Sequence, residues 1–511
     1  METAMQVLGN LFSFHMLIAC LIGTLVGVVL GAIPGMNGGI GIAVCLPFTY
    51  SMAPAQGLAF LGGMYVGSSY GGSIAGILIN VPGTAESACT TIEGYPMTVR
   101  GEGKKALYLS VLSSSFGSVV GLLALVFCAP LLADVAVKFG PPEMLLLSLC
   151  GLTIVGALTG KDIIRGMFAA CFGLFLAMVG VDEASGQFRL YFGLRLLRGG
   201  VGLIPAVIGL FAVAEMMKQG ISVSAKEGHS QIQLLPASVR KTWHFIWHDR
   251  MLLLLKSSAI GTFIGILPGT GGAISSFLAY GEAKGKDTEG TFGKGNPDGI
   301  IASESANNAA VGGSLVPMLA LGIPGSSTSA IMFGALTIHG LVPGQSLFSE
   351  HADIVYTFFG GMFLVTCFML LIGIVGIPLF SSIVKIDIKK IIPFVLLFSL
   401  IGAYSVNNSV YDVGIAMMMG LVGVFFSRVG ISVTPVVLGL ILGDLIESNF
   451  IRTVTIAGAE GVNPLVYMFA RPLCLAILAL TVYLIAANVR ALKRSRQIQQ
   501  ATSNTQDLRE E

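Results

Sequence analysis

The sequence predicts an all-α polytopic membrane protein with about 10–12 transmembrane segments, arranged as two inverted repeats with re-entrant hairpins and broken helices. Three observations support this prediction. Charged residues make up only 11% of the 511 residues and apolar residues 54%, and the mean hydropathy is +0.84. A Pro-Gly motif interrupts the apolar sequence four times. The two halves of the chain also resemble each other, which indicates an internal duplication.

The composition excludes several other classes of protein. A water-soluble domain could not hide so much apolar surface, and a net charge of +2 is too small to suggest nucleic-acid binding. The chain begins METAMQVLGNLF without a basic segment and runs into the first span, so we expect no cleaved signal peptide. The eight cysteines lie in apolar stretches without a C-x-x-C pair. We therefore expect no disulfide, no structural metal site and no cofactor.

Each Pro-Gly motif is expected to interrupt a helix inside the membrane. The copies read IPGMNGG from Ile33, VPGTAES from Val81, LPGTGGA from Leu267 and IPGSSTS from Ile323. Proline lacks a backbone donor and clashes with the preceding turn, and glycine relaxes the chain further. Broken backbone at membrane depth is tolerated only where it is buried in protein or lines a wet cavity, so the motifs indicate a transport site. The helix-breaking residues are Pro34, Gly35, Pro82, Gly83, Pro268, Gly269, Pro324 and Gly325.

Three separate blocks of sequence recur in the second half at a nearly constant spacing. GVVLGAIPGMNGG from Gly27 matches GTFIGILPGTGGA from Gly261, and IPAVIGL matches TPVVLGL. GGSIAGILINVPG from Gly71 matches GGSLVPMLALGIPG from Gly312, with one residue inserted. The predicted domains are a first repeat at 11–218, a cytoplasmic linker with an interfacial helix at 219–250, a second repeat at 251–446, a final transmembrane helix at 464–488 and a cytoplasmic tail at 489–511.

The distribution of Lys and Arg indicates that the repeats are inverted. The linker and the C-terminal tail are basic, so the positive-inside rule places both in the cytoplasm. RGEGKK, residues 100–105, occupies the position that PGQSLFSEH, without Lys or Arg, occupies in the second half. Equivalent loops therefore face opposite sides, and we expect the N-terminus in the periplasm. One loop, 182–199, does not follow the positive-inside rule: it is placed outside although it carries three arginines.

Two further polar segments have simpler interpretations. KTWHFIWHDR, residues 241–250, carries two Trp, two His and flanking charges, which suits a helix lying in the membrane interface. Asp444 and Glu447, near Arg452, are interpreted as a boundary ion pair.

The residues beside the four breaks form the candidate substrate site. After each break a new half-helix begins, whose first backbone N–H groups lack an intrahelical partner and whose dipole end is positive. With neighbouring hydroxyl and amide groups, such ends can bind carboxylate oxygens without a buried arginine. The preceding half-helices end in free carbonyls that suit Na⁺. The candidate substrate-binding residues are Asn37, Gly38, Thr84, Ser87, Thr270, Gly271, Ser326, Ser327 and Thr328.

Four further residues are candidates for cation coupling. Glu86 lies within VPGTAES, and Glu304, Asn307 and Asn308 lie within ESANNAAVGG. An ionisable residue inside the membrane is a functional hypothesis by default, and mid-helix Asn is costly enough in lipid that it should face the protein interior. An ionised Glu86 would repel an anionic substrate, so it should be protonated or paired with a cation when substrate binds. For Glu304, a position at the interface beside Asp298 is the alternative.

These motifs, together with ESANNAAVGGSLVPMLALGIPGSSTSAIMFGALTIHGLVPG, resemble the large membrane subunit of the tripartite tricarboxylate transporters, the TctA family, over roughly residues 11–490. The resemblance implies a bacterial inner-membrane secondary transporter of elevator type, similar to ion-transporter superfamily members. It also implies two partners, a small TctB-like membrane subunit and a periplasmic TctC-like binding protein. The implied cargo is citrate or another di- or tricarboxylate, driven by a Na⁺ or H⁺ gradient. The residues implied to contact substrate are Thr84, Glu86, Ser87, Ser326, Ser327 and Thr328.

Two alternatives from other functional classes remain open. An uncoupled organic-anion channel would use the same polar breaks but conduct only down a gradient. An intramembrane serine hydrolase would use GSSYG, which fits G-x-S-x-G with Ser69 as the nucleophile and His339 as the base. That motif lies in a Gly-rich apolar run, where small residues for helix packing explain it, so the hydrolase is the much weaker alternative.

Overall fold

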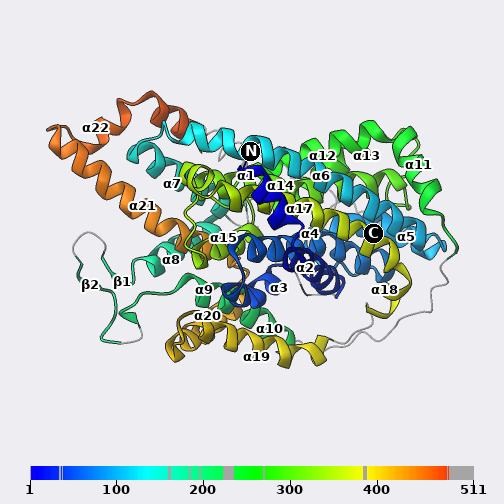
Figure 1. Ribbon diagram of the computed structural model, residues 1–511, viewed down its shortest axis with the longest axis horizontal. Coiled ribbons are helices and arrows are strands. Elements are labelled where there is room, and N and C mark those ends of the chain that lie inside the picture. The colour runs from blue at the N-terminus through cyan, green and yellow to red at the C-terminus, as the bar shows by residue number, and fades with distance from the viewer. Residues whose placement is uncertain are drawn as a thin grey trace, which may run out of the picture. The chain divides into compact units, whose positions relative to one another are not determined.

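In the computed structural model, helices form almost all of the regular structure, and a short antiparallel pair, β1 (Gly180–Val181) and β2 (Phe188–Arg189), is the only sheet in the described part of the chain (Figure 1). The structure describes residues 2–33, 36, 38–158, 163–182, 186–194, 197–221, 235–268, 271–383, 388–479 and 481–482. The chain divides into two compact units, residues 1–138 with 201–429 and residues 139–200 with 430–511.

Most helices belong to the first unit. In its N-terminal part they are α1 (Glu2–Leu11), α2 (Phe14–Ala32), α3 (Gly38–Cys45), the 3₁₀ turn Leu46–Ser51, α4 (Pro54–Ile79), α5 (Ala88–Val99) and α6 (Gly103–Ala136). From residue 201 onward they are α9 (Leu203–Val207), a π-helical turn (Ile208–Val213), α10 (Ala214–Ile221), α11 (Val239–Asp249), α12 (Met251–Ile266), α13 (Gly271–Lys284), α14 (Pro297–Leu321), α15 (Ser327–Ile338), α16 (Gln345–Glu350), α17 (Ala352–Val375), α18 (Ile377–Ile383), α19 (Ile388–Asn407) and α20 (Val410–Arg428). The second unit contains α7 (Pro141–Leu158), α8 (Ile163–Ala177), α21 (Thr434–Ala459) and α22 (Pro464–Phe469).

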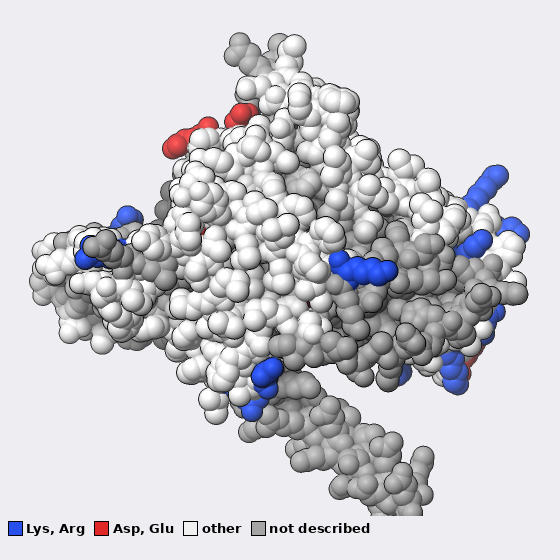
Figure 2. Space-filling view, turned by 90° about the horizontal axis from the view of Figure 1, so that it is seen from below, with Lys and Arg blue, Asp and Glu red and all other residues white. Residues whose placement is uncertain are grey.

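The surface is that of a multi-pass membrane protein. Among the described residues, seven helices are long and apolar enough to cross a bilayer: α2, α6, the stretch 203–220, α17, α19, α20 and α21. Large apolar side chains such as Phe14, Leu252 and Val410 are more than 70% exposed, which lipid but not water would tolerate at this density. Figure 2 shows one face that is nearly free of acidic and basic side chains over most of its area.

The two helices at the centre of the first unit differ from these outer spans. Nearly every residue of α4 from Gly57 to Leu78 is buried, and so is every residue of α14 from Gly299 to Ala320. Both helices are rich in Gly and Ser, and α4 adds two Tyr residues and α14 two Asn residues. Because protein surrounds them on all sides, they carry polar groups that a lipid-facing helix could not carry.

The sequence repeat recurs as a repeat of contacts. α2 packs closely on α4, where a Cβ at Gly31 would lie 2.5 Å from the carbonyl oxygen of Ser68. In the second half α12 packs on α14 in the same way, where a Cβ at Gly265 would lie 2.6 Å from the carbonyl oxygen of Ala310. Since Gly31 and Gly265 match in the sequence repeat, Ser68 and Ala310 are structurally equivalent.

This equivalence corrects the alignment of the middle block by one residue. A Cβ at Gly71 would meet the Val28 carbonyl oxygen at 2.4 Å, and a Cβ at Gly313 would meet the Thr262 carbonyl oxygen at 2.5 Å. Gly71 therefore corresponds to Gly313 and not to Gly312, which instead approaches α6. The prediction of one inserted residue in this block is wrong, because GGSIAGILINVPG aligns with the segment from Gly313 without a gap.

In the second unit, two of the three arginines in loop 182–199 have described partners. Arg189 donates two hydrogen bonds of 2.5 Å to the carboxylate of Glu447 and another, of 3.2 Å, to Asp182. Arg198 lies over the rings of Phe188 and Tyr191. Glu447 thus pairs with Arg189, whereas the sequence had suggested Arg452 as its neighbour.

Helix α11 has the two-sided character expected of the linker segment. Thr242 and Ile246, one turn apart, are buried against the neighbouring helices. On the other side Trp243 and Trp247 stack with ring centroids 5.4 Å apart and remain more than 40% exposed. An amphipathic helix that exposes a pair of tryptophans suits the membrane interface, which stays a prediction.

Candidate functional site

All four Pro-Gly motifs lie where a helix ends. α2, α4, α12 and α14 end at Ala32, Ile79, Ile266 and Leu321, and α3, α5, α13 and α15 begin after the breaks. Pro82, Gly83, Pro268, Pro324 and Gly325 lie between these helices, and their role at a transport site stays a prediction. The remaining predicted residues at the two hairpin tips, Pro34, Gly35, Asn37, Gly269 and Thr270, lie outside the described residues.

The two breaks that follow the central helices share one hydrogen-bonding device. When the gap-free alignment that starts at Gly71 and Gly313 is continued, Thr84 and Ser87 correspond to Ser326 and Ser329. The backbone N–H of Ser87 donates to the Thr84 hydroxyl, and the N–H of Thr84 donates to the Ser87 hydroxyl, both at 3.3 Å. Ser326 and Ser329 exchange the same two bonds at 2.9 and 3.0 Å. The Ser326 and Ser329 pair is a capping box at the start of α15, and the Thr84 and Ser87 pair makes the same reciprocal bonds in the turn that leads into α5.

The two breaks also approach each other around one cavity in the first unit. It encloses about 530 Å³ of free space, counting its open mouth. The residues that line it are Gly38, Gly39, Tyr65, Ser68, Ser69, Thr84, Ala85, Glu86, Phe211, Ser327 and Thr328. They come from the start of α3, the middle of α4, the break before α5, the π-helical turn and the start of α15.

The electrostatics of this cavity favour an anion beside a cation. The N-terminal ends of α3 and α15 lie in its wall, together with the loop that leads into α5, and each end is the positive pole of a helix dipole. Hydroxyl groups of Thr84, Ser327 and Thr328 add donors. The wall contains one carboxylate, Glu86, and no Lys or Arg among its described residues. An anion here would be held by dipoles and hydroxyls, and a cation would balance Glu86.

The predicted substrate residues divide into three groups. Gly38, Thr84, Ser327 and Thr328 line the cavity, as does the coupling candidate Glu86. Ser87 and Ser326 do not, because their hydroxyls take part in the reciprocal bonds described above. Gly271 is also absent from the wall and adopts a left-handed conformation with φ of 62° at the start of α13. The substrate role of each residue stays a prediction.

Sequence reasoning missed five residues of the wall, and it named Ser69 only as the nucleophile of the hydrolase alternative; the five are Gly39, Tyr65, Ser68, Ala85 and Phe211. Tyr65 is 7% exposed, and its hydroxyl bonds to Ser326 at 2.7 Å and to Ser314 at 3.2 Å, so it ties α4 to the second break. Phe211 belongs to the π-helical turn, a rare feature that often marks functional sites. A tyrosine inside a run of glycine and serine was the one signal that could have identified Tyr65.

Asn307 approaches Glu86 from the second half. Asn307 is 1% exposed, and its amide donates to the Ser69 carbonyl oxygen at 3.2 Å. Its own side-chain oxygen has no hydrogen-bond partner. A Cβ at Gly272 would lie 2.3 Å from that oxygen and 2.9 Å from Cγ of Glu86, so both side chains reach the same glycine. An unpartnered amide oxygen beside a carboxylate has the donor chemistry of a cation ligand.

Glu304 lies in a different place from the other coupling candidates. It is fully buried and accepts hydrogen bonds from Thr90 and, at 2.8 and 3.3 Å, from Ser114 and Ser110. The alternative position at the interface beside Asp298 is wrong, since Asp298 pairs with Arg250 at 2.5 Å and Glu304 faces α5 and α6. Asn308, also fully buried, lines a second, smaller cavity.

A further buried carboxylate, Glu93 on α5, was not anticipated. Its oxygens accept from the Tyr280 hydroxyl at 2.8 Å and from three backbone N–H groups at 2.5–2.8 Å. Those N–H groups belong to Gly293, Gly295 and Asn296. Four donors to one carboxylate satisfy it fully, so Glu93 anchors the loop before α14 to α5.

The serine–histidine pair that a hydrolase would need is not formed. Ser69 lies within the continuous helix α4 rather than on a sharp turn. A Cβ at Gly57 would lie 2.8 Å from Nε2 of His339, so this histidine lies near the start of α4. Twelve residues of helix separate Gly57 from Ser69, which is about 18 Å. The base is therefore far from the proposed nucleophile.

Comparison with known proteins gives a consistent result. Residues 17–438 match the model of the family described as "Tripartite tricarboxylate transporter TctA family". An "Uncharacterized 52.8 kDa protein in TAR-I ttuC' 3'region" from Agrobacterium vitis is 31% identical over 87% of this chain and 88% of its own length. An "Uncharacterized protein in TAR-II ttuC' 3'region" from the same organism is 31% identical over 39% of this chain and 83% of its own length. No solved structure is significantly similar.

Proposed function

The chain belongs to the tripartite tricarboxylate transporter TctA family, the large membrane subunits of these systems, and from this premise we propose that it carries out cation-coupled uptake of a di- or tricarboxylate such as citrate. In this proposal a periplasmic binding protein delivers the carboxylate, and a small membrane subunit completes the transporter in the bacterial inner membrane. The coupling ion is Na⁺ or H⁺.

One observation carries the proposal: two broken helices from different halves of the chain, together with the start of α3, surround a cavity in which Glu86 is the only charged group among the described residues. Carboxylates suit such a site because helix N-termini and hydroxyls bind their oxygens without a fixed positive charge. A weakly charged site can release its anion again once the cation leaves. A buried arginine would hold the anion more tightly and would slow that release.

The cavity also supports coupling rather than free conduction. The unpartnered oxygen of Asn307 and the carboxylate of Glu86 provide cation ligands at the edge of the anion site. A cation bound there attracts the anion, so each ligand raises the affinity for the other by the same factor. An uncoupled channel has no need of this arrangement.

The test is carboxylate binding and uptake by a Ser327→Ala, Thr328→Ala double variant. We expect citrate affinity, measured calorimetrically on the purified chain, to fall by about tenfold or more, because two hydroxyl donors to a carboxylate are lost. Ser326 is left intact since its hydroxyl caps α15. The matched control is Thr337→Ala on the same helix, whose exposed hydroxyl bonds only to the Phe333 carbonyl oxygen.

Unchanged binding in the double variant would exclude this cavity as the substrate site. Uptake into proteoliposomes with both partner proteins then separates the transporter from a channel. Accumulation of citrate above its external concentration, driven by an imposed Na⁺ or pH gradient, supports coupled transport. Equilibration without accumulation would instead support a channel.

A further inference from the structure

The buried carboxylate of Glu304 lies in a cage of hydroxyl groups contributed by the other half of the chain. Thr90 on α5 donates to Oε1, and Ser110 and Ser114 on α6 donate to Oε2. Ser73 on α4 extends the cage through a 2.8 Å bond to Ser110. All of these residues are at most 1% exposed. Three helices therefore converge on one acidic group of α14.

No basic side chain balances this carboxylate. Among the described residues, no ion pair involves Glu304, and its titratable neighbours are Tyr70 on α4 and Cys89 on α5, both of which are neutral acids. The nearest charged group along α14, Asp298, is paired with Arg250. A lone carboxylate ion in a protein interior is costly, so this group needs a proton or a metal ion when it is enclosed.

The geometry of the cage favours a proton over a metal ion. The hydroxyls of Thr90 and Ser114 contact the carboxylate oxygens directly, at hydrogen-bonding distance. A coordinated Na⁺ would instead separate these oxygens and would need several of their lone pairs to point at a common centre. The cage as built matches a carboxyl group that exchanges a proton while its hydrogen-bond partners stay in place.

We propose that Glu304 is the proton-binding site that couples transport to the pH gradient, separate from the carboxylate-binding cavity. The inference rests on the proposed function, since it adds a site for H⁺ at Glu304 to the cation site proposed at Glu86 and Asn307. On this proposal one proton binds to Glu304 before inward movement and leaves it afterwards. No other chemical bond forms or breaks.

Helix α5 connects this site to the carboxylate-binding cavity. Glu86, in the wall of that cavity, lies in the break just before α5, and Thr90, a hydrogen-bond donor to Glu304, lies in the first turn of α5. The break that carries Glu86 therefore leads directly into the helix turn that carries Thr90. A carboxylate or cation that shifts the start of α5 therefore changes the bond between Thr90 and Glu304. This shared helix is the physical link by which substrate can alter proton binding.

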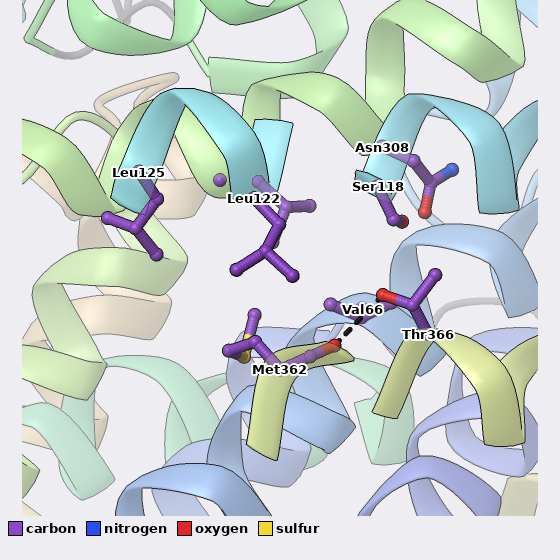
Figure 3. Close-up of a pocket in the computed structure, with 9 residues that line it drawn as sticks. Val66, Ser118, Leu122, Leu125, Asn308, Met362 and Thr366 are labelled. Carbon is purple, nitrogen blue, oxygen red and sulfur yellow. Dashed lines mark hydrogen bonds between the residues drawn. The ribbon is translucent and has the colours of Figure 1, made fainter. Parts of the chain in front are cut away.

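A small cavity on the other side of Glu304 offers a route for the proton. Its polar wall is formed by Ser118 and Asn308, each one helical turn beyond Ser114 and Glu304 on α6 and α14. Figure 3 shows both side chains beside a small space, with Val66 and Thr366 across from them. The volume that a water molecule can enter is about 10 Å³, which is room for about one water. The Ser118 hydroxyl and the Asn308 side-chain oxygen have no protein partner. Buried polar atoms that face a free space are satisfied by water, which can carry a proton.

The direct test is infrared spectroscopy of the purified chain as a function of pH. We expect a carbonyl stretch of a protonated buried carboxyl group in the wild type, lost in Glu304→Gln and retained in Glu304→Asp. The matched control is Glu282→Gln, since Glu282 is paired with Lys256 and Lys286 and contributes no such band. A band unchanged by Glu304→Gln would overturn the proposal. Citrate binding by each variant shows that it is folded.

Transport by the complete tripartite system provides the second test. Glu304→Gln, which resembles the protonated state, should keep citrate exchange across the membrane while losing about tenfold or more of the uptake driven by an inward pH gradient. Thr90→Val removes the hydroxyl that connects α5 to Glu304. The infrared band should therefore remain in this variant, but it should no longer change when citrate binds. If Glu304→Gln loses Na⁺-driven uptake but keeps pH-driven uptake, the assignment of Glu304 as the proton site is overturned. A wild type that shows the band but never accumulates carboxylate would refute the proposed function and leave the proton site standing.

Discussion

The break between α4 and α5 and the break between α14 and α15 share a backbone but differ in chemistry. Both have the same reciprocal pair of side-chain–backbone bonds, and both glycines, Gly83 and Gly325, donate to a backbone carbonyl of the preceding central helix at 3.0 and 3.2 Å. Yet Glu86 corresponds to Thr328, and Tyr65 corresponds to Asn307. Glu304 has no acidic counterpart, since Gly62 occupies the equivalent position. The duplication therefore preserved the backbone of the break in both halves, whereas each carboxylate belongs to one half only.

The strongest test of the shared backbone is substitution of the two equivalent glycines. A Cβ at Gly83 would lie 2.0 Å from the Gly31 carbonyl oxygen, and one at Gly325 would lie 2.4 Å from that of Gly265. Because backbone atoms cannot give way, Gly83→Ala and Gly325→Ala should each destabilise the protein by about 3 kcal/mol. The melting temperature of the detergent-purified chain measures this. Gly281→Ala, with no atom within 4 Å of its Cβ, is the control and should be neutral.

If only one of these two variants is destabilised, the breaks are not equivalent and the structural repeat does not extend to them. If both are tolerated, the close contacts between α2 and α4 and between α12 and α14 are looser than described.

The second prediction concerns the difference in charge between the breaks. Glu86→Gln should lower carboxylate uptake by about thirtyfold, because it removes the only charged group among the described residues of the cavity wall and with it the cation that helps to hold the anion. Thr328→Ala at the equivalent position should cost about tenfold, since it removes one hydroxyl donor. Initial rates in proteoliposomes at varied cation concentration measure both. The cation dependence should weaken in the Glu86 variant alone, and equal weakening in both would contradict the asymmetry.

Sequence reasoning reached the fold class and the breaks because both follow from local chemistry. Proline and glycine interrupt helices wherever they occur, and low charge marks a membrane protein before any contact is known. Sequence reasoning failed where the composition of the site depends on which way a side chain points. Ser87 and Ser326 turn back to bond nearby backbone, whereas Tyr65, from the middle of a buried helix, reaches the cavity. Likewise, only the three-dimensional contacts reveal that Arg189 lies beside Glu447.

The third prediction tests whether Tyr65 joins the two halves. Tyr65→Phe removes a buried hydroxyl bonded to Ser326 and Ser314, leaving two serine hydroxyls with one partner fewer. We expect a loss of about 1–2 kcal/mol in stability, together with a raised KM for the carboxylate. Tyr411→Phe, on an exposed face of α20, is the control. A stable variant with an unchanged KM would show that the Tyr65 hydroxyl does not organise the second break.

The fourth prediction compares the two reciprocal pairs of side-chain–backbone bonds. Ser87→Ala and Ser329→Ala occupy equivalent positions and should each cost about 1 kcal/mol, because each removes an acceptor for one backbone N–H and a donor to a carbonyl. Thermal unfolding of both variants measures this. A difference above about 1 kcal/mol would show that one of these serines has a further role, such as a direct substrate contact.

The smallest effect concerns the connections that lead into the central helices, where the halves differ most. α3 reaches α4 through the short apolar turn Leu46–Ser51, whereas α13 reaches α14 through a polar loop that Asp287 organises. The backbone N–H groups of Phe292, Glu289 and Thr291 donate to Asp287 and hold the pKa of its carboxyl below the ordinary value. A carboxyl with a lowered folded-state pKa stabilises the protein above its ordinary pKa, and that contribution is lost as the pH falls through the folded value.

The wild type should therefore lose a little stability below about pH 4, and Asp287→Asn should abolish that part of the pH dependence. Melting temperatures across acidic pH measure it, with Glu289→Gln in the same loop as the control. An identical acid profile in Asp287→Asn would show that this loop contributes nothing to the position of α14.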